Sequence, residues 1–391
     1  MVIAGVHHLG EIPAAVTALA GAWLLRTVID AVTKRNRSNG NGSPPARYRV
    51  VQWATGNIGT RALREVIRHP SLDLVGLLVY DPAKDGVDAG TLCGEEPVGV
   101  KATTDRAAIR ALGADCALYM PRVMDLADVV ALLESGTNVV TTCGEFFDAG
   151  RPLGEERRAQ VIDACAKGSA SLYATGSSPG FITDALPLAL LSMQRRVDSI
   201  EIDEFANLSR RDSPHMLFEL MGFGRPVASF NVNGASAHLL RSFSPSLGVL
   251  AAAAGRPIDR WSSTGEVAVS RRTERLAAGE LAAGRVAAHR TAIVGYHDGA
   301  EVVRFTPTWY CTTDTDPAWD LRPTGWRVRV RGDAPFDVAM PFPIPLEELG
   351  SHTPAYTANR PVNAIRYVCA APPGILSTAD LPPITPAGPP T

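Results

Sequence analysis

Two glycines, Gly56 and Gly59, are separated by only two residues. An apolar strand-like run, Tyr48–Ala54, precedes them, and a helical pattern, Asn57–His69, follows. In this order one glycine can let the backbone approach a pyrophosphate, and the other can let the helix pack close to the strand. The helix N-terminus, with its partial positive charge, would then face the phosphates. The predicted dinucleotide-binding loop comprises Ala54, Thr55, Gly56, Asn57, Ile58 and Gly59.

An acidic residue follows at a suitable distance from this loop. Asp81 ends the apolar run Leu72–Asp81, about 20 residues beyond the glycines, where a carboxylate can accept hydrogen bonds from the adenosine ribose. A turn-forming Asp before Pro82 is the structural alternative. Lys84 could offset repulsion between Asp81 and a 2′-phosphate. The sequence therefore predicts NAD or NADP as the cofactor.

The segment GSSPG, residues 176–180, formally matches the nucleophile elbow of hydrolases. In that motif the residue after the nucleophilic Ser donates its backbone N–H to the oxyanion hole. Here that residue is Pro179, which has no N–H, so the match does not support a hydrolase. The segment follows the run Ser171–Thr175 and should lie where open α/β sheets bind ligands. Ser178 and Pro179 are therefore expected to line the nicotinamide pocket.

A candidate acid/base follows another apolar run. Glu145 comes two residues after the run Asn138–Cys143, which places it at the same edge of the predicted sheet. Two neighbouring phenylalanines could desolvate it and adapt it to proton transfer, and Phe146 is expected to touch the substrate. A solvated loop Glu is the alternative. The residues of this run expected to contact the cofactor are Thr142 and Cys143.

Further candidates lie in the second half of the chain, in FANLSRRDSPHM. Asn207 and His215 follow a strand-like run and are expected to face the substrate, with a structural role for each as the alternative. Nearby charged residues are interpreted as a solvated face; they are Asp203, Glu204, Arg210 and Arg211.

Alternating apolar runs and amphipathic segments predict the elements that position these residues. This alternation is typical of βαβ units around a parallel sheet. The predicted strands are Tyr48–Ala54, Leu72–Asp81, Val98–Thr103, Cys116–Met120, Asn138–Cys143 and Ser171–Thr175. The predicted helices are Asn57–His69, Asp105–Leu112, Leu126–Glu134, Glu155–Lys167 and Phe181–Leu191.

Beyond Leu191 the pattern changes to longer strand-like runs separated by Gly and Pro turns, which favours an antiparallel or mixed sheet in a second domain. These runs are Ser199–Phe205, Gly265–Arg271, Thr291–Tyr296, Glu301–Thr312 and Trp326–Val330. A last helix is predicted over Asn363–Ala371, followed by a Pro-rich tail. The predicted organisation is an extension and linker (1–46), a Rossmann domain (47–178), a substrate and dimerisation domain (179–350) and a returning helix with tail (351–391).

Length and composition agree with a two-domain globular protein. The chain has 391 residues, 46% of them hydrophobic, and a formal net charge of −2, which provides no basic footprint for nucleic acid. Six cysteines without a CxxC pair predict neither a zinc site nor a disulfide framework, but thiols in a reducing compartment. The uncharged stretch Ile12–Leu25 is too short to span a membrane. We expect a cytoplasmic protein with a small-molecule substrate, no metal, and no membrane or nucleic-acid partner.

With WATGNIG, ATGSSPGFITDALP and PVNAIRYVCAAPPGI in place, the chain resembles the dihydrodipicolinate-reductase-like superfamily over roughly residues 48–382. It is most similar to 2,4-diaminopentanoate dehydrogenase and the native NAD(P)H-dependent amine dehydrogenases. The resemblance implies a homodimer, with a Rossmann domain, a mixed-sheet domain and a final helix that returns to the first. Gly56 and Gly59 match the phosphate loop, and Ser178–Gly180 matches an Asn-Pro-Gly loop with Ser in place of Asn.

The match is incomplete at the catalytic position. The family's fifth strand ends in Cys-Glu-Glu, whereas this chain has Cys143, Gly144 and Glu145, which leaves open whether Glu145 replaces the family's acid. Dihydrodipicolinate reductase itself does not fit, because its double-His motif and Lys-containing loop have no counterpart.

The implied reaction is hydride transfer between NAD(P) and a carbon that bears nitrogen, in an amine or ketone substrate, with Glu145 as acid/base. An NAD(P)-dependent dehydrogenase acting on C–OH and a non-catalytic NAD(P)-binding sensor are the alternatives.

The extension yields a first prediction. Removal of residues 1–46 should leave cofactor affinity and thermal stability nearly unchanged, because the segment NRSNGNGSPP is a typical linker that separates the extension from the fold. Thermal unfolding and cofactor titration of both chains measure this. A truncation that unfolds the protein or abolishes its dimerisation would contradict the prediction.

Overall fold

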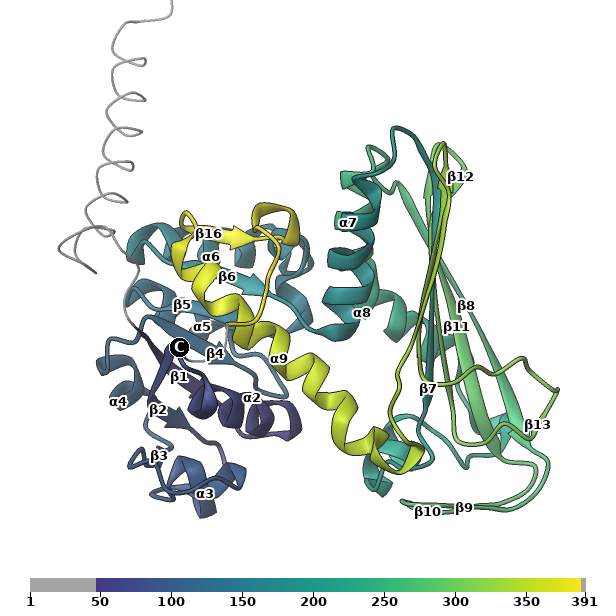
Figure 1. Ribbon diagram of the computed structural model, residues 1–391, viewed down its shortest axis with the longest axis horizontal. Coiled ribbons are helices and arrows are strands. Elements are labelled where there is room, and N and C mark those ends of the chain that lie inside the picture. The colour runs from purple at the N-terminus through teal and green to yellow at the C-terminus, as the bar shows by residue number, and fades with distance from the viewer. Residues whose placement is uncertain (1–46, 388–391) are drawn as a thin grey trace, which may run out of the picture. The chain divides into compact units, whose positions relative to one another are not determined.

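The computed structural model describes residues 47–387, and from Tyr48 onward these belong to one compact unit (Figure 1). The expectations for the extension, its linker and the run Ile12–Leu25 lie outside the described residues. Two seven-stranded sheets form the framework of the described part. Within residues 47–387, no helix combines the length and apolarity needed to cross a membrane.

The first sheet is parallel throughout and has the order β16-β6-β5-β4-β1-β2-β3, which contains the Rossmann arrangement. The predicted Rossmann fold is thus confirmed. Strands β4, β5 and β6 are buried at every position, which explains their continuous apolar runs. The strands are β1 (Tyr48–Trp53), β2 (Leu72–Leu78), β3 (Ala102–Thr103), β4 (Cys116–Tyr119), β5 (Asn138–Thr141), β6 (Ser171–Ala174) and β16 (Gly374–Leu376).

Helices cover both faces of this sheet, because alternate residues of each strand point to opposite sides. In β4, Ala117 and Tyr119 belong to a core with α5 and α6, while Cys116 and Leu118 belong to a core with α2 and α9. Asp side chains cap the N-termini of α3, α4 and α5. The helices are α2 (Asn57–Arg68), α3 (Ala89–Cys93), α4 (Arg106–Ala111), α5 (Leu126–Glu134), α6 (Glu155–Gly168) and α9 (Leu349–Ala370).

The C-terminal segment differs from its prediction. Helix α9 begins at Leu349, well before the predicted Asn363, and continues through Pro354 and Pro361, both buried. Proline disfavours a helix interior, but here the burial of a long apolar face against the first sheet outweighs that cost. The Pro-rich tail also contributes a strand, since β16 pairs with β6 in parallel. The prediction of a simple tail was therefore wrong for Gly374–Leu376.

The second sheet has the order β13-β8-β11-β12-β7-β14-β15. It is mixed: β7 runs parallel to β12, whereas the other neighbours are antiparallel, so a purely antiparallel sheet is not what forms. The strands are β7 (Val197–Asn207), β8 (Arg260–Ser270), β11 (Val286–His297), β12 (Ala300–Tyr310), β13 (Thr315–Asp316), β14 (Gly325–Gly332) and β15 (Phe336–Pro341). Strands β9 (Glu274–Leu276) and β10 (Gly279–Leu281) form a separate hairpin.

One face of the second sheet packs against helices α7 (Leu186–Leu191) and α8 (Val232–Ala253). The sequence pattern did not predict α8. Its buried residues Leu239, Phe243, Leu247 and Leu250 recur at helical spacing and meet apolar residues of the sheet.

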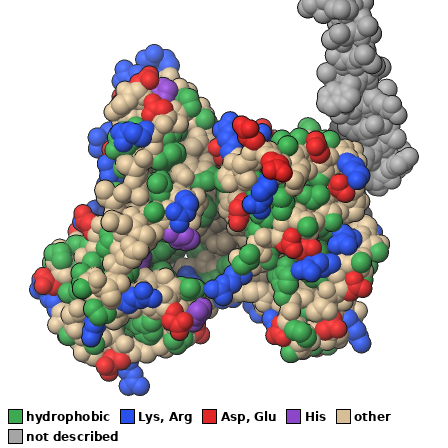
Figure 2. Space-filling model, turned by 180° about the vertical axis from the view of Figure 1, so that it is seen from behind, with side chains coloured by type: hydrophobic (Ala, Val, Ile, Leu, Met, Phe, Trp, Pro, Cys, Tyr) green, Lys and Arg blue, Asp and Glu red, His purple; other side chains and the backbone are tan. Residues whose placement is uncertain are grey.

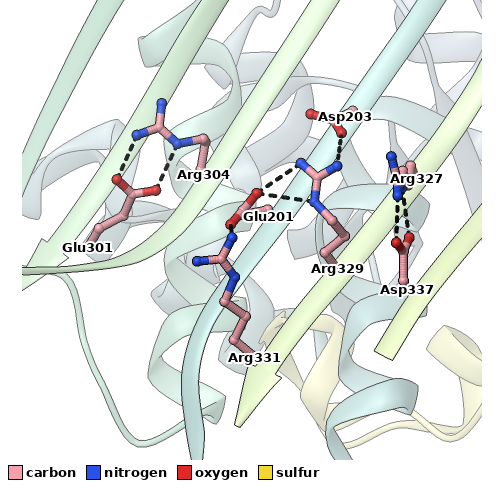
Figure 3. A network of polar contacts seen from close by, with 8 residues as sticks. All are labelled: Glu201, Asp203, Glu301, Arg304, Arg327, Arg329, Arg331 and Asp337. Carbon is pink, nitrogen blue, oxygen red and sulfur yellow. Dashed lines mark hydrogen bonds and ion pairs between the residues drawn. The ribbon is translucent and has the colours of Figure 1, made fainter. Parts of the chain in front are cut away.

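The opposite face of this sheet carries ion pairs in place of a helix layer (Figure 3). Arg329 of β14 binds Glu201 and Asp203 of the adjacent β7, each at 2.9 Å. Arg327 pairs with Asp337 across β14 and β15, and Arg304 pairs with Glu301 within β12. On this face, the carboxylates of β7 are therefore paired with an arginine of the neighbouring strand.

Helix α9 provides a stability prediction. Ile365 is fully buried between α9 and the first sheet, so Ile365→Ala should lower the free energy of unfolding by about 2–5 kcal/mol. Val123 is 78% exposed, and Val123→Ala is the matched control, with a change of at most about 0.5 kcal/mol. Denaturant unfolding followed by circular dichroism measures both. A loss below about 1 kcal/mol for Ile365→Ala would contradict the packing of α9.

Candidate active site

The carboxyl ends of four parallel strands lie at one level of the first sheet. Trp53 of β1 is in register with Tyr119 of β4, Tyr119 with Thr141 of β5, and Thr141 with Ala174 of β6. The segments that continue from these strands therefore start at a common edge. They include the predicted phosphate loop, the segment that carries Glu145 and the Ser-Ser-Pro loop.

The phosphate loop makes a tight turn between β1 and α2. Ala54 has a positive φ of 77°, and the Gln52 side-chain amide donates to its carbonyl oxygen at 3.0 Å. A Cβ at Gly59 would lie 2.3 Å from that same oxygen, so only Gly lets α2 approach β1 here. A Cβ at Gly56 would meet no protein atom within 4 Å, which means that space remains beside Gly56 for a ligand. The loop thus fits the pyrophosphate of a dinucleotide.

The N-terminus of α2 adds donors and positive charge to this space. Gly56 is its N-cap, no side chain caps it, and its first turn carries no acidic residue. The first amides of such a helix can donate to an anion. Lys84 lies beside the loop, where its ammonium group contacts the Thr55 hydroxyl at 3.1 Å.

Asp81 lies beyond the end of β2. Its carboxylate accepts the backbone N–H of Ala83 at 3.0 Å and caps the short 3₁₀ helix Pro82–Lys84. The turn-forming role is therefore present. The side chain is exposed, so this role leaves it accessible to a ligand.

The Ser-Ser-Pro loop (Ser177–Pro179) follows β6 and opens the segment Ser177–Ala185, in which Ser178, Pro179 and Gly180 have non-helical backbone angles. Gly180 has a φ of 119°, which an L side chain rarely adopts. The Ser177 hydroxyl lies 2.6 Å from that of Thr357 on α9. The Ser178 Oγ is buried and has no hydrogen-bond partner among the described residues. A ligand at the edge of the sheet could satisfy it.

A cavity of about 710 Å³ joins this edge to the second sheet. Its walls include Asn57 and Ile58 of the phosphate loop, Ser177 and Ser178, and many residues of the second domain. The volume is in the range for small-molecule ligands. Figure 2 shows the molecule hollowed at its centre, with basic and His side chains around the rim.

A carboxylate is built into the cavity wall by the register of the second sheet. Glu204 of β7 is 8% exposed, and its two oxygens accept the indole N–H groups of Trp309 and Trp326, each at 2.9 Å. On one side, Glu204 is paired with Trp326 of β14. On the other side it is paired with Pro307 of β12, and Trp309 follows Pro307 by two residues in that strand. Adjacent strands thus hold the carboxylate from both sides.

A neutral imidazole lies next to Trp309. His289 of β11 is paired with Trp309, and their ring centroids are 5.5 Å apart. Burial lowers the pKa of His289 to about 4, so the ring is uncharged near neutral pH. Its Nε2 has no hydrogen-bond partner among the described residues. His289 thus adds an unsatisfied polar atom, but no positive charge, beside Trp309.

Cations gather at another part of the cavity wall. Arg210 and Arg211 line the cavity, and burial lowers the pKa of Arg211, with a further decrease from the neighbouring charge of Arg61. Arg61 belongs to α2 and donates to the Asn57 side chain at 2.8 Å. Arg211 therefore lies near Arg61 on the phosphate-loop side of the cavity, where an anion would relieve the repulsion between the two guanidinium groups.

The predicted site residues have different fates. Asn207 lines the cavity, as expected, and its side-chain oxygen accepts the Ser209 N–H. His215 does not line it; the imidazole is exposed and lies 2.7 Å from Glu219. Phe146 is also misplaced by the prediction, since it is fully buried in the core of the Rossmann domain.

The segment after β5 is at the sheet edge but outside the cavity wall. Glu145 is partly exposed in the 3₁₀ helix Gly144–Phe146 and is not a lining residue. The Cys143 thiol belongs to the core, and burial raises its pKa to about 11. Thr142, between β5 and this helix, is half-buried. The structure therefore leaves the role of Glu145 as a prediction.

Sequence reasoning missed Glu204 and His289, and it assigned Glu204 to a solvated face. One signal was available: in SIEIDEF, Glu204 follows the two-residue alternation of the buried Ile200 and Ile202. The burial of His289 depends on contacts with Phe223, Phe230 and Trp309 from distant segments, and no local pattern indicates it.

Known proteins resemble this chain in both sequence and fold. A family model described as the 2,4-diaminopentanoate dehydrogenase C-terminal domain matches residues 181–387. An amine dehydrogenase of Streptomyces virginiae is 29% identical over 349 residues, which cover 85% of this chain and 96% of the relative.

Solved structures agree with the fold. An amine dehydrogenase of Mycobacterium smegmatis superposes with a TM-score of 0.68 at 21% identity, covering 86% of this chain and 97% of its own. A probable dehydrogenase of Thermotoga maritima gives a TM-score of 0.53 at 12% identity, covering 85% and 92%. At these identities the likeness supports the two-domain architecture.

The position of Asp81 yields a prediction about cofactor choice. Asp81→Ala should shift the ratio of kcat/KM for NAD and NADP roughly 10- to 100-fold towards NADP, because a carboxylate that binds the ribose diol and repels a 2′-phosphate is removed. Asp163→Ala, on an exposed position of α6, is the control. An unchanged ratio would mean that Asp81 acts only as the cap of the following turn.

Proposed function

Because the chain belongs to the 2,4-diaminopentanoate dehydrogenase family, we propose that it is an NAD(P)-dependent amine dehydrogenase that acts on the CH–NH₂ group of a small molecule. In the oxidative direction an alkylammonium ion, NAD(P)⁺ and water give a carbonyl compound, NAD(P)H, an ammonium ion and a proton. The reverse direction is a reductive amination.

The observation that carries this proposal is the single cavity shared by the dinucleotide loop and the second domain. Its wall includes Asn57 and Ile58, which begin the helix expected to face the pyrophosphate. The fit of the loop to a dinucleotide depends on the close approach of Gly59 and the open space at Gly56. Held there, the dinucleotide would supply a hydride acceptor or donor.

The chain's own residues then have separate tasks. The Ser-Ser-Pro loop brings the buried, unpartnered Ser178 Oγ to the cavity, where it can orient a polar ligand group. Aromatic side chains of the second domain, including Trp309 and Trp326, exclude water from the opposite wall. Asn207 offers an amide at the same wall.

Proton transfer is assigned to Glu145. Its segment starts at the same sheet edge as the phosphate loop, because β1, β4 and β5 are in register there. In the oxidative direction a carboxylate at this edge would take a proton from the water that attacks the iminium carbon. In reductive amination it would return that proton to the departing hydroxyl group.

The homodimer rests on the family resemblance, and the cytoplasmic location rests on the six cysteines without a CxxC pair. We propose a homodimer in the cytoplasm, with residues 179–350 as the substrate and dimerisation domain. Light scattering coupled to size-exclusion chromatography measures the oligomeric state. Fractionation of cells that express the full chain measures the location.

A panel of amines and ketones, followed by NAD(P)H absorbance with and without ammonium, tests the proposed reaction. Ketone reduction that requires ammonium supports it. Ammonium-independent reduction would indicate a C–OH dehydrogenase, and cofactor binding without any turnover would indicate a sensor.

The acid/base assignment has its own prediction. Glu145→Gln keeps the size of the side chain but removes proton transfer, so kcat should fall about 10²- to 10⁴-fold while the Kd for the cofactor hardly changes. The control Glu155→Gln, at the exposed start of α6, should keep kcat. A Glu145→Gln variant that retains more than about half of the wild-type kcat would refute the assignment.

A further inference from the structure

Glu204 differs from the other carboxylates of its strand. Glu201 and Asp203 point to the outer face of the second sheet, and each is paired with Arg329 at 2.9 Å (Figure 3). Glu204 points to the inner face, is 8% exposed and lines the cavity, and no Lys, Arg or His of the described part forms an ion pair with it. A buried charge normally has a partner of opposite charge, because desolvation is costly.

The two hydrogen bonds of Glu204 do not supply that charge. Trp309 and Trp326 donate neutral indole N–H groups, and an indole N–H can only donate. Both carboxylate oxygens therefore act as hydrogen-bond acceptors. These bonds fix the orientation of the group but bring no positive charge to it.

The contacts that the arginines of the cavity wall make within the described part of the chain are with groups other than Glu204. Arg210 pairs with Glu347 at 3.8 Å, and Arg225 donates to the Glu219 carbonyl oxygen at 2.9 Å. Arg211 lies close enough to Arg61 of α2 for their charges to interact, on the side of the phosphate loop. His289, beside Trp309, is neutral because burial lowers its pKa to about 4.

Aromatic rings surround this part of the cavity. The Trp326 ring meets Phe342 at 4.7 Å between centroids, and Phe342 meets Tyr356 at 4.8 Å; all three line the cavity with Trp309. Aromatic faces attract cations, and a carboxylate among them forms a site for a positively charged nitrogen attached to an apolar group.

We propose that Glu204 is the counter-charge for the cationic nitrogen of the substrate, so that the site selects alkylammonium ions over neutral alcohols of the same shape. This inference rests on the proposed function and names its substrate class. It assigns substrate binding to Glu204, separately from the acid/base role of Glu145.

Binding without turnover tests the proposal. Isothermal titration calorimetry of the full chain, with and without NADH at pH 7.5, compares cyclohexylamine, which is protonated at this pH, with cyclohexanol, its neutral analogue. The wild type should bind cyclohexylammonium at least about 10-fold more tightly, the range expected for a charged hydrogen bond. Equal affinity for the two probes, or no detectable binding of either, would overturn the proposal without recourse to any variant.

Variants then locate the preference. Glu204→Gln should weaken cyclohexylammonium binding roughly 10- to 100-fold and change cyclohexanol binding less than about threefold. The matched control Asp203→Asn removes a carboxylate from the next residue, on the opposite face of β7, and should keep the preference. Glu204→Asp keeps the carboxylate and should retain part of the preference for cyclohexylammonium. It provides a second variant if Glu204→Gln perturbs folding. A Glu204→Gln protein with the wild-type preference would overturn the assignment.

The outcome is separable from that of the proposed function. A cation preference that depends on Glu204, in a protein that oxidises no amine, would support the inference and contradict the proposed reaction. Amine oxidation with an unchanged KM for the amine in Glu204→Gln would support the proposed reaction and contradict the inference about Glu204.

Discussion

The burial of helix α9 against the Rossmann sheet is the constraint on which the site depends. Its C-terminal half, with Val362, Ile365 and Val368, completes the core that α2 and one face of β4 would otherwise leave exposed. Its N-terminal half lines the cavity, and Thr357 binds Ser177 of the Ser-Ser-Pro loop. The same helix therefore stabilises the cofactor domain and closes the substrate cavity. This dual task explains why the helix persists through two prolines.

The cavity has an uneven distribution of charge. Positive groups lie near the phosphate loop, where Arg61 and Arg211 repel one another and the α2 N-terminus has free amide donors. A negative group, Glu204, lies on the second sheet with only neutral donors. An anionic dinucleotide and a cationic amine would each meet the opposite charge. This distribution therefore favours the dinucleotide at the phosphate loop and the amine at the second sheet.

Local sequence signals were sufficient for the first domain and insufficient for much of the second. The βαβ alternation and the glycine spacing act over a few residues, so the phosphate loop, strands β1 to β6 and helices α2, α4, α5 and α6 could be predicted, whereas the short helix α3 could not. Helix α8 and strand β16 were missed because tertiary burial, which a single sequence does not display, outweighs their weak local pattern. The same limit applies to the site: Phe146 and His215 have suitable chemistry, but only the fold shows one in the core and the other exposed.

Strand β7 shows how a functional charge can be separated from a structural one. Its outward carboxylates, Glu201 and Asp203, have arginine partners that offset their charge on the sheet surface. Glu204 is more deeply buried, where the cost of an uncompensated charge is greater, yet the fold provides only two indole donors for it. An apolar residue at this position would pack against Ile202 and the tryptophans without that cost. A residue that lowers local stability is expected where a site must bind a ligand. A fixed, desolvated carboxylate interacts with a cation far more strongly than a solvated one does. A positively charged ligand that completes the site would therefore explain why the ligand-free protein bears the free-energy cost of burying Glu204.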